Sequence, residues 1–169
     1  VEGQTRSRLM IGKRTKRVLI GLALVVVLIV GALAMMSLFS RKPSNLGVVN
    51  GRLAPCPASP NCVSTQATDD EHRMEPIPFT GSSEKAMQRI KDVVAQMPRT
   101  KIVTVEDDYL HAEFRSAMFR FVDDVEFMVD PEAQLIHFRS ASRVGHSDLG
   151  VNRRRMEKIR AALRYTLDL

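Results

Sequence analysis

The longest apolar stretch of the chain runs from Val18 to Phe39 and contains no charged residue. It has 22 residues, and a helix needs roughly 20 to cross the hydrocarbon core of a bilayer. Six Lys or Arg residues precede it, whereas only Arg41 and Lys42 follow it closely. By the positive-inside rule, residues 1–17 form a basic cytoplasmic arm and the C-terminal part lies outside the cytoplasm. The sequence therefore predicts a single-pass protein of the cell (inner) membrane, anchored in the lipid bilayer by residues 18–39.

The same stretch also fits a cleaved signal peptide, because Ala32-Leu33-Ala34 matches the small-residue pattern of a cleavage site. The apolar run continues for five residues beyond that site, which favours the retained anchor. Both interpretations deliver residues 43–169 to the same side, which is the periplasm in a bacterium with two membranes. We expect a linker over residues 40–51 and one extracytoplasmic domain over residues 52–169.

The basic excess of the chain, a formal net charge of +6, lies almost entirely before the apolar run. Six basic residues stand against one acidic residue before position 18, whereas 19 stand against 18 from position 40 onward. The part predicted to fold is therefore close to neutral and lacks the electropositive field of a nucleic-acid-binding domain. We expect no nucleic-acid partner.

Cys56 and Cys62 are the two cysteines of the chain and lie six positions apart. In an oxidising compartment an isolated pair is typical of a disulfide, which would stabilise the fold by about 2.4 kcal/mol on the chain-entropy model. A metal site would need further ligands, with Asp69, Asp70 and His72 as the nearest candidates, and the C-x5-C spacing matches no standard zinc knuckle. A pair of inert reduced thiols is the third interpretation.

Two helices are predicted after the cysteines. Ser82 or Ser83 can cap a helix over residues 84–97, which carries an apolar stripe. A second helix is expected over residues 152–166, with apolar residues on its inward face and basic residues mostly on its outward face.

Four strands are predicted between these helices. Residues 101–106 and 109–115 alternate as strands, and two more strands meet at a turn over residues 130–134. The fold class is therefore α+β: an antiparallel sheet of about four strands, flanked by two helices and preceded by one N-terminal transmembrane helix.

The strands on either side of the second turn carry the densest group of polar residues. Alternation puts Asp124 and Glu126 on one face of the sheet and the apolar residues between and after them on the other. Matching the apolar faces of both strands then places Arg139 with the two acids. Pairing Asp130 with Leu135 sets Glu126 directly opposite Arg139, a cross-strand ion pair worth about 0.2–1 kcal/mol if exposed.

Asp123 does not fit this pattern, because strict alternation places it on the apolar face beside Phe121 and Phe127. Either a β-bulge rotates Asp123 outward, or it is a buried acid that needs a partner such as an arginine. The sequence leaves both interpretations open.

Three ordered motifs resemble those of one protein family. They are Pro55-Cys56 with Ser59 to Ser64 (SPNCVS), then Phe121 to Phe127 (FVDDVEF), then Arg139 to Gly145 (RSASRVG) with Ser147 to Arg153 (SDLGVNR). Over residues 50–166 the chain resembles the domain of unknown function 1499 family. The resemblance implies a bacterial or plastid protein that is often membrane-anchored or exported. It implies no activity, so no catalytic residue is carried over.

Hydrolysis and metal binding are two interpretations of the polar residues. A triad from the consecutive His146, Ser147 and Asp148 has poor geometry, because three adjacent side chains do not easily converge. A triad that draws on His111 or His137 keeps hydrolysis open. A metal site would need carboxylates that the arginines leave unpaired, which the near-equal charge count argues against. The side chains that such a metal site would combine are Asp123, Asp124, Glu126 and His146.

An anion pocket is the third interpretation. Arg139 and Arg143 precede a loop that leads to a helix N-terminus near Asn152, where exposed N–H groups and the positive end of the helix dipole suit phosphate or carboxylate. The fourth is structural, with the charged side chains binding the loop to the sheet and leaving no ligand site. The candidate ligand-binding residues are Asp123, Asp124, Glu126, Arg139, Arg143, His146 and Asn152.

We therefore expect a membrane-anchored extracytoplasmic domain with a binding or structural role in the cell envelope and a small anion-binding site. The alternative is an envelope hydrolase that uses the polar face around Asp124, Arg139, Arg143 and His146. The sequence assigns no catalytic residue, no metal ligand and no cofactor. It leaves open whether the protein is an enzyme.

Overall fold

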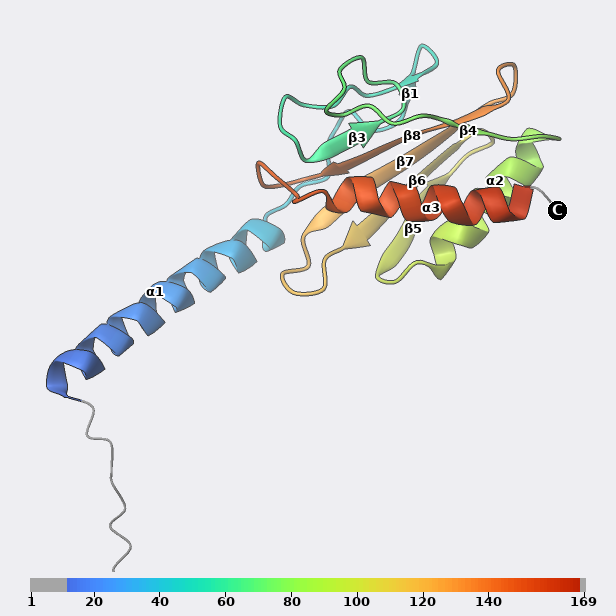
Figure 1. Ribbon diagram of the computed structural model, residues 1–169. Coiled ribbons are helices and arrows are strands. Elements are labelled where there is room, and N and C mark those ends of the chain that lie inside the picture. Colours follow the sequence, from blue (N-terminus) through green and yellow to red (C-terminus); the bar gives the residue numbers. More distant parts are fainter. Residues whose placement is uncertain (1–11, 168–169) are drawn as a thin grey trace, which may run out of the picture.

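The computed structural model describes residues 12–167, which form one long N-terminal helix and an α+β domain (Figure 1). The helix α1 spans Lys13–Leu38 and none of its side chains is buried. It is long and apolar enough to cross a membrane. Of the predicted basic arm, residues 1–11 lie outside the described residues, as do residues 168–169 at the other end of the chain.

The main sheet has six strands, so the expectation of about four is wrong. Two strands that form one edge of the sheet were missed, because they have only two or three residues and no alternating run. Both are defined by their pairing with the last strand. All strand pairs in the sheet are antiparallel. Along the sheet the strands are β3 (Cys62–Ser64), β8 (Leu135–Ser142), β7 (Val122–Asp130), β6 (Tyr109–Arg115) and β5 (Thr100–Val105), with β4 (Ile77–Pro78) also on β8.

Two helices, α2 (Ser83–Gln96) and α3 (Val151–Leu167), cover one face of the sheet (Figure 1). Each predicted boundary lies within one residue of the observed one. The Ser82 hydroxyl caps α2 by accepting from the Lys85 backbone N–H at 3.5 Å, which confirms the predicted start of that helix.

The main hydrophobic core lies between these helices and the sheet. Val125, Phe127 and Val129 alternate onto this face and are buried, as the strand pattern predicts. Burial of these apolar side chains is the main favourable term that holds the helices on the sheet. The helical residues that face them are Ala86, Met87, Ile90, Val94, Met156, Ile159 and Leu163.

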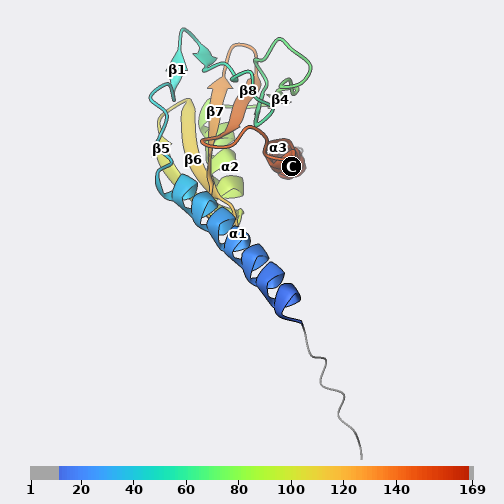
Figure 2. The ribbon, with the colours of Figure 1, turned by 90° about the vertical axis from the view of Figure 1, so that its left-hand side faces the viewer.

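The opposite face of the sheet lies under residues 43–57, which we call the roof segment. It contains a small hairpin, β1 (Val48–Val49) and β2 (Arg52–Leu53), and Leu53 packs with Tyr109 and Met128 in a second apolar cluster. Within the stretch expected as a linker, residues 40–51, no residue is buried, and Gly47 contacts the sheet through a hydrogen bond to Glu126. Figures 1 and 2 show α1 leaving the domain on the side away from this hairpin.

Candidate functional site

The sheet face beneath the roof segment carries a set of buried charged and polar side chains, which we call the charged cluster. Alternate residues of β6, β7 and β8 supply most of them, and one arginine follows β8 directly. The carboxylates of Asp124 and Glu126 are almost fully buried, 1% and 0% exposed. Such charges persist in a protein interior only when they are paired and hydrogen-bonded. The members are Tyr109, His111, Glu113, Asp124, Glu126, Arg139 and Arg143.

Glu126 and Arg139 are direct cross-strand partners, as the predicted pairing of Asp130 with Leu135 requires. Arg139 Nη1 donates to Glu126 Oε2 at 3.1 Å, while the Tyr109 hydroxyl donates to Oε1 at 2.9 Å. Burial, followed by the charge of Glu126, raises the pKa of Tyr109 far above its usual range, so the phenol remains a donor. The Glu126 carboxylate is thus held by several donors at once.

Asp124 is held by Arg143 and His111. Arg143 donates from Nε and Nη2 to the two carboxylate oxygens at 2.8 and 2.7 Å, and His111 Nε2 lies 2.8 Å from Oδ1. Burial would raise the pKa of Asp124, but the hydrogen bonds from Arg143 and His111 outweigh it and hold the pKa below its usual value. Arg143 Nη2 also donates to Glu113 at 2.6 Å, so two carboxylates engage this arginine.

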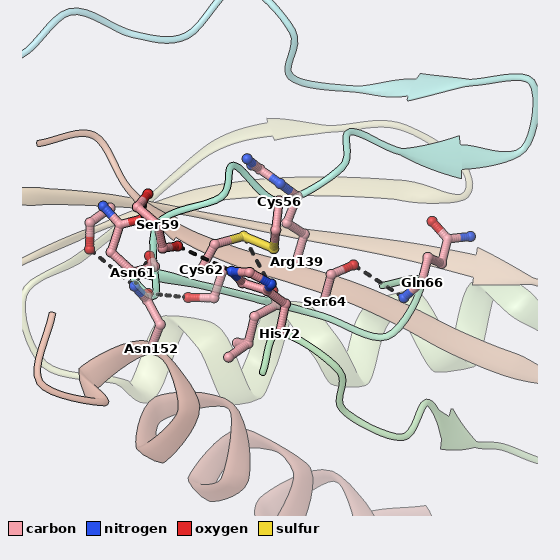
Figure 3. Close-up of a disulfide and its surroundings, with 12 residues drawn as sticks. Cys56, Ser59, Asn61, Cys62, Ser64, Gln66, His72, Arg139 and Asn152 are labelled. Carbon is pink, nitrogen blue, oxygen red and sulfur yellow. Dashed lines mark hydrogen bonds between the residues drawn. A yellow bond between two sulfur atoms is a disulfide. The ribbon is translucent and has the colours of Figure 1, made fainter. Parts of the chain in front are cut away.

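Arg139 differs from Arg143 in how its donors are used. Only Nη1 bonds to Glu126, and Nε is buried without a hydrogen-bond partner within residues 12–167. The residue is 5% exposed, so water does not readily replace the missing partner. Figure 3 shows its side chain beside the disulfide of Cys56 and Cys62. The Nε–H group of Arg139 is therefore a buried hydrogen-bond donor that is not used by the described residues.

A pocket of about 390 Å³ lies between the roof segment and the charged cluster. Prolines form much of its roof side, whereas charged residues and the end of β8 form its floor. The lining residues are Pro43, Asn45, Pro55, Cys56, Pro57, Asp124, Arg139, Ala141, Ser142 and Arg143.

A backbone hydrogen bond and the disulfide help to hold the roof segment over this pocket. The Gly47 backbone N–H donates to Glu126 Oε1 at 2.8 Å, and Gly47 has φ of +110°, a conformation that favours glycine. The predicted disulfide is present, with Cα atoms 5.7 Å apart, and joins Cys56 at the end of the roof segment to Cys62 in β3. Cys62 pairs with Ala141, so it lies on the same face as the charged cluster.

Asp123 lies on the other face of the sheet, beneath α3, and Asn152 lies in the first turn of α3 above it. Asp123 is buried with an arginine partner, since Arg155 Nη2 donates to its Oδ2 at 2.5 Å, and β7 pairs without a bulge at this position. Asn152 Oδ1 accepts from Ser140 Oγ and Arg155 Nη1 at 2.5 and 2.6 Å. Sequence reasoning missed Arg155, although it lies one helical turn after Asn152 on the inward side of α3.

His146, Ser147 and Asp148 do not converge. His146 is exposed in the loop after β8 and has no hydrogen bond to the described residues. Ser147 Oγ accepts from the Leu149 backbone N–H, and Asp148 accepts from those of Gly150 and Asn152. The Asp148 carboxylate therefore occupies the N-terminus of α3, where the sequence suggested that an external anion could bind.

The seven candidate site residues thus divide into three groups. Asp124, Glu126, Arg139 and Arg143 come together, Asp123 and Asn152 form a separate buried group, and His146 stands apart. Because the acids lie on two faces, they do not form one metal-ligand set. In the part of the chain that the structure describes, no three His, Cys, Asp or Glu side chains are placed to hold a metal ion.

Comparison with protein families gives a match over residues 52–163 to the family described as a protein of unknown function (DUF1499). The match begins at β2 and ends within α3, so it includes the disulfide, the whole sheet and the charged cluster. A search of curated proteins finds no match.

Proposed function

The chain belongs to the DUF1499 family of proteins of unknown function, and we propose that it is a membrane-anchored extracytoplasmic domain that binds a small anion through Arg139. In this proposal α1 is the anchor, and the basic residues before the apolar run keep the N-terminus in the cytoplasm. The domain then lies in the periplasm or its equivalent. The disulfide supports this compartment, because disulfides persist mainly in oxidising environments.

The observation that carries the proposal is the buried Nε of Arg139, which lacks an acceptor within the described residues and belongs to a pocket-lining side chain. Leaving such a donor unsatisfied costs about 1–3 kcal/mol. A ligand oxygen in the pocket would remove that cost if the Arg139 side chain shifted to bring Nε to the pocket surface. A site that leaves a buried donor unpaired in this way favours ligands that supply a strong acceptor.

The chemistry of the pocket favours a small carboxylate or phosphate compound. Arginine binds both groups well, because its planar N–H donors match their oxygen geometry. The pocket volume of about 390 Å³ lies within the usual range for small-molecule sites. Arg143 pairs with the Asp124 carboxylate at the pocket floor and is shared with Glu113, so Asp124 repels the ligand less than a lone charge would.

The roof segment gives the pocket a preformed shape. Gly47 ties its middle to Glu126, and the disulfide ties its end to β3. Prolines with fixed φ angles, Pro43, Pro55 and Pro57, line the roof side. A preformed site loses less conformational entropy on binding, which favours affinity for a small ligand.

Thermal unfolding of the full chain in detergent micelles tests this proposal. Sodium phosphate and sodium acetate are compared with sodium chloride at equal ionic strength. We expect saturable stabilisation by phosphate, acetate or both, reaching about 2.7 kcal/mol at a ligand concentration 100-fold above Kd.

The matched variant is Arg139→Gln combined with Glu126→Gln, which removes both charges of the pair and leaves no lone buried carboxylate. Stabilisation by the anions should be absent in this double variant and retained in Lys85→Gln, which removes an exposed charge on α2. Equal stabilisation of all three proteins, or none in the unmodified chain, would refute the Arg139 site.

A further inference from the structure

The loop between β6 and β7, residues 116–121, lies beside the C-terminal end of α1 in both ribbon views (Figures 1 and 2). Two hydrogen bonds close its base: Ser116 N–H donates to the Phe121 carbonyl, and Phe121 N–H donates to Ser116 Oγ, both at 2.9 Å. Met118 at the tip is 80% exposed. The loop thus presents an apolar side chain from a fixed base.

A crevice of about 680 Å³ separates this loop from α1. One wall is the apolar side of the helix, and the other is the loop with its apolar tip and basic flank. The lining residues that matter here are Val30, Ala34, Leu38, Met118, Phe119 and Arg120.

The position of the crevice along α1 sets its depth in a bilayer. Val30 and Leu38 both line it, so it follows about 12 Å of the helix axis at 1.5 Å per residue. The apolar run ends at Phe39, so this stretch lies in the outer leaflet when α1 spans the membrane. The end of the crevice at Leu38 then lies near the boundary between lipid headgroups and acyl chains, and the end at Val30 lies deeper among the acyl chains.

The charge of this region is positive. Arg115 and Arg120 flank the apolar tip, and Arg41 and Lys42 follow α1. Neither the loop nor the stretch after α1 up to position 42 contains an acidic residue. Arg115 shares an ion pair with Glu113, whereas Arg120 has no ion pair within residues 12–167. An anionic partner complements this surface better than a neutral one.

We propose that loop 116–121 is a second membrane contact, which binds anionic phospholipid at the exit of α1. Met118 and Phe119 enter the acyl region beside the helix, and Arg120 binds the lipid phosphate. This inference rests on the membrane anchoring proposed above. It resembles other interfacial contacts, in which apolar side chains enter about 5–10 Å while arginine remains at headgroup level.

The test uses the full chain in lipid vesicles, with tryptophan as a depth reporter. The sequence contains no tryptophan, so Met118→Trp introduces a single indole. Two matched variants supply references: Leu28→Trp in the middle of α1, and Val105→Trp at the opposite end of the sheet. Quenching by lipids brominated on the acyl chains is measured in vesicles of phosphatidylcholine with and without phosphatidylglycerol.

We expect strong quenching for Leu28→Trp and Met118→Trp and none for Val105→Trp. Adding Arg120→Gln to the Met118→Trp chain should lower the ratio of inserted to free loop about fivefold in the anionic vesicles and little in the neutral ones. Adding Lys85→Gln instead should leave the ratio unchanged.

The outcomes separate this inference from the anchor itself. Quenching of Leu28→Trp without quenching of Met118→Trp overturns the loop contact and leaves the anchor in place. Absence of quenching for Leu28→Trp overturns the anchor and the loop contact together. Equal quenching of Met118→Trp in both vesicle types, unaffected by Arg120→Gln, overturns the anionic lipid as the ligand.

Discussion

Glu126 and Arg139 face each other across β7 and β8 as a buried ion pair, with Arg139 Nη1 3.1 Å from Glu126 Oε2. The second oxygen of the same carboxylate, Oε1, accepts a hydrogen bond from the Gly47 backbone N–H of the roof segment. One residue pair therefore links the sheet to the segment that covers it. Taking two charges out of water is costly. This ion pair therefore contributes more to positioning Glu126 and the roof segment than to net stability.

Arg139→Ala should lower the free energy of unfolding by about 3–5 kcal/mol, because it leaves the Glu126 carboxylate buried without its counter-charge. Urea unfolding of the full chain in micelles measures this loss. Adding Glu126→Gln should recover part of it, since contacting sites are not additive. An Arg139→Ala chain as stable as the unmodified one would show that the pair is not needed to neutralise Glu126.

Replacing both cysteines by serine should destabilise the fold by about 2.4 kcal/mol, because the short loop between them loses its cross-link. It should also free the end of the roof segment. Hydrogen exchange at the Gly47 amide should then accelerate more than exchange at Phe127 in the central strand β7. If Gly47 and Phe127 accelerate equally, the disulfide does not hold the roof locally.

His72 should make stability depend on pH near neutrality. Its Nδ1 lies 2.6 Å from Asp69 Oδ1 and its Nε2 3.1 Å from the Ser59 carbonyl, two acceptors that only the doubly protonated ring can satisfy together. Burial lowers the pKa of His72, but the hydrogen bonds to Ser59 and Asp69 outweigh it, so the pKa is raised above 6.5. The stabilisation is therefore complete below pH 6.5 and is lost as pH rises through the folded-state pKa.

Unfolding free energies measured from about pH 5.5 to about pH 8.5 test this dependence in the unmodified chain and in His72→Gln, which should remove it. His137 is a useful contrast, because burial lowers its pKa, and its contribution is lost as pH falls below 6.5. An unchanged pH profile in His72→Gln would contradict the assignment.

The orientation in the membrane can be tested with two reporters fused to the C-terminus after Leu169, a residue outside the described part of the chain. A reporter that works only outside the cytoplasm should be active, because in the proposed topology the basic residues before the apolar run hold the N-terminus inside. Activity of a reporter that works only in the cytoplasm would reverse the topology.

Strand alternation was enough to predict the core of the charged cluster. It placed Asp124 and Glu126 on one face, and the turn after Asp130 fixed the register that sets Glu126 against Arg139. The same rule applied to β6 could have added Tyr109, His111 and Glu113, because they alternate with the apolar Leu110, Ala112 and Phe114. Alternation works here because the sheet buries both of its faces and tolerates no slip in register.

The contacts of the roof segment with the sheet could not be predicted from the sequence, because they do not follow a repeating pattern. Gly47 reaches Glu126 across 79 positions through a backbone amide, a group that every non-proline residue carries. Similarly, β3 and β4 exist only through pairing with β8. The division of the seven candidate residues between two faces depends in part on where α3 packs, which local spacing does not determine.

The most direct test of the anion site observes the Arg139 Nε–H group by nuclear magnetic resonance in the full chain, labelled with ¹⁵N-arginine and held in micelles. Arg143 is an internal reference, because its Nε already donates to Asp124. We predict that phosphate or acetate shifts the Arg139 Nε–H resonance saturably and leaves that of Arg143 nearly unchanged. A resonance of Arg139 that does not respond to either anion, or that moves in parallel with every other arginine, would contradict the account.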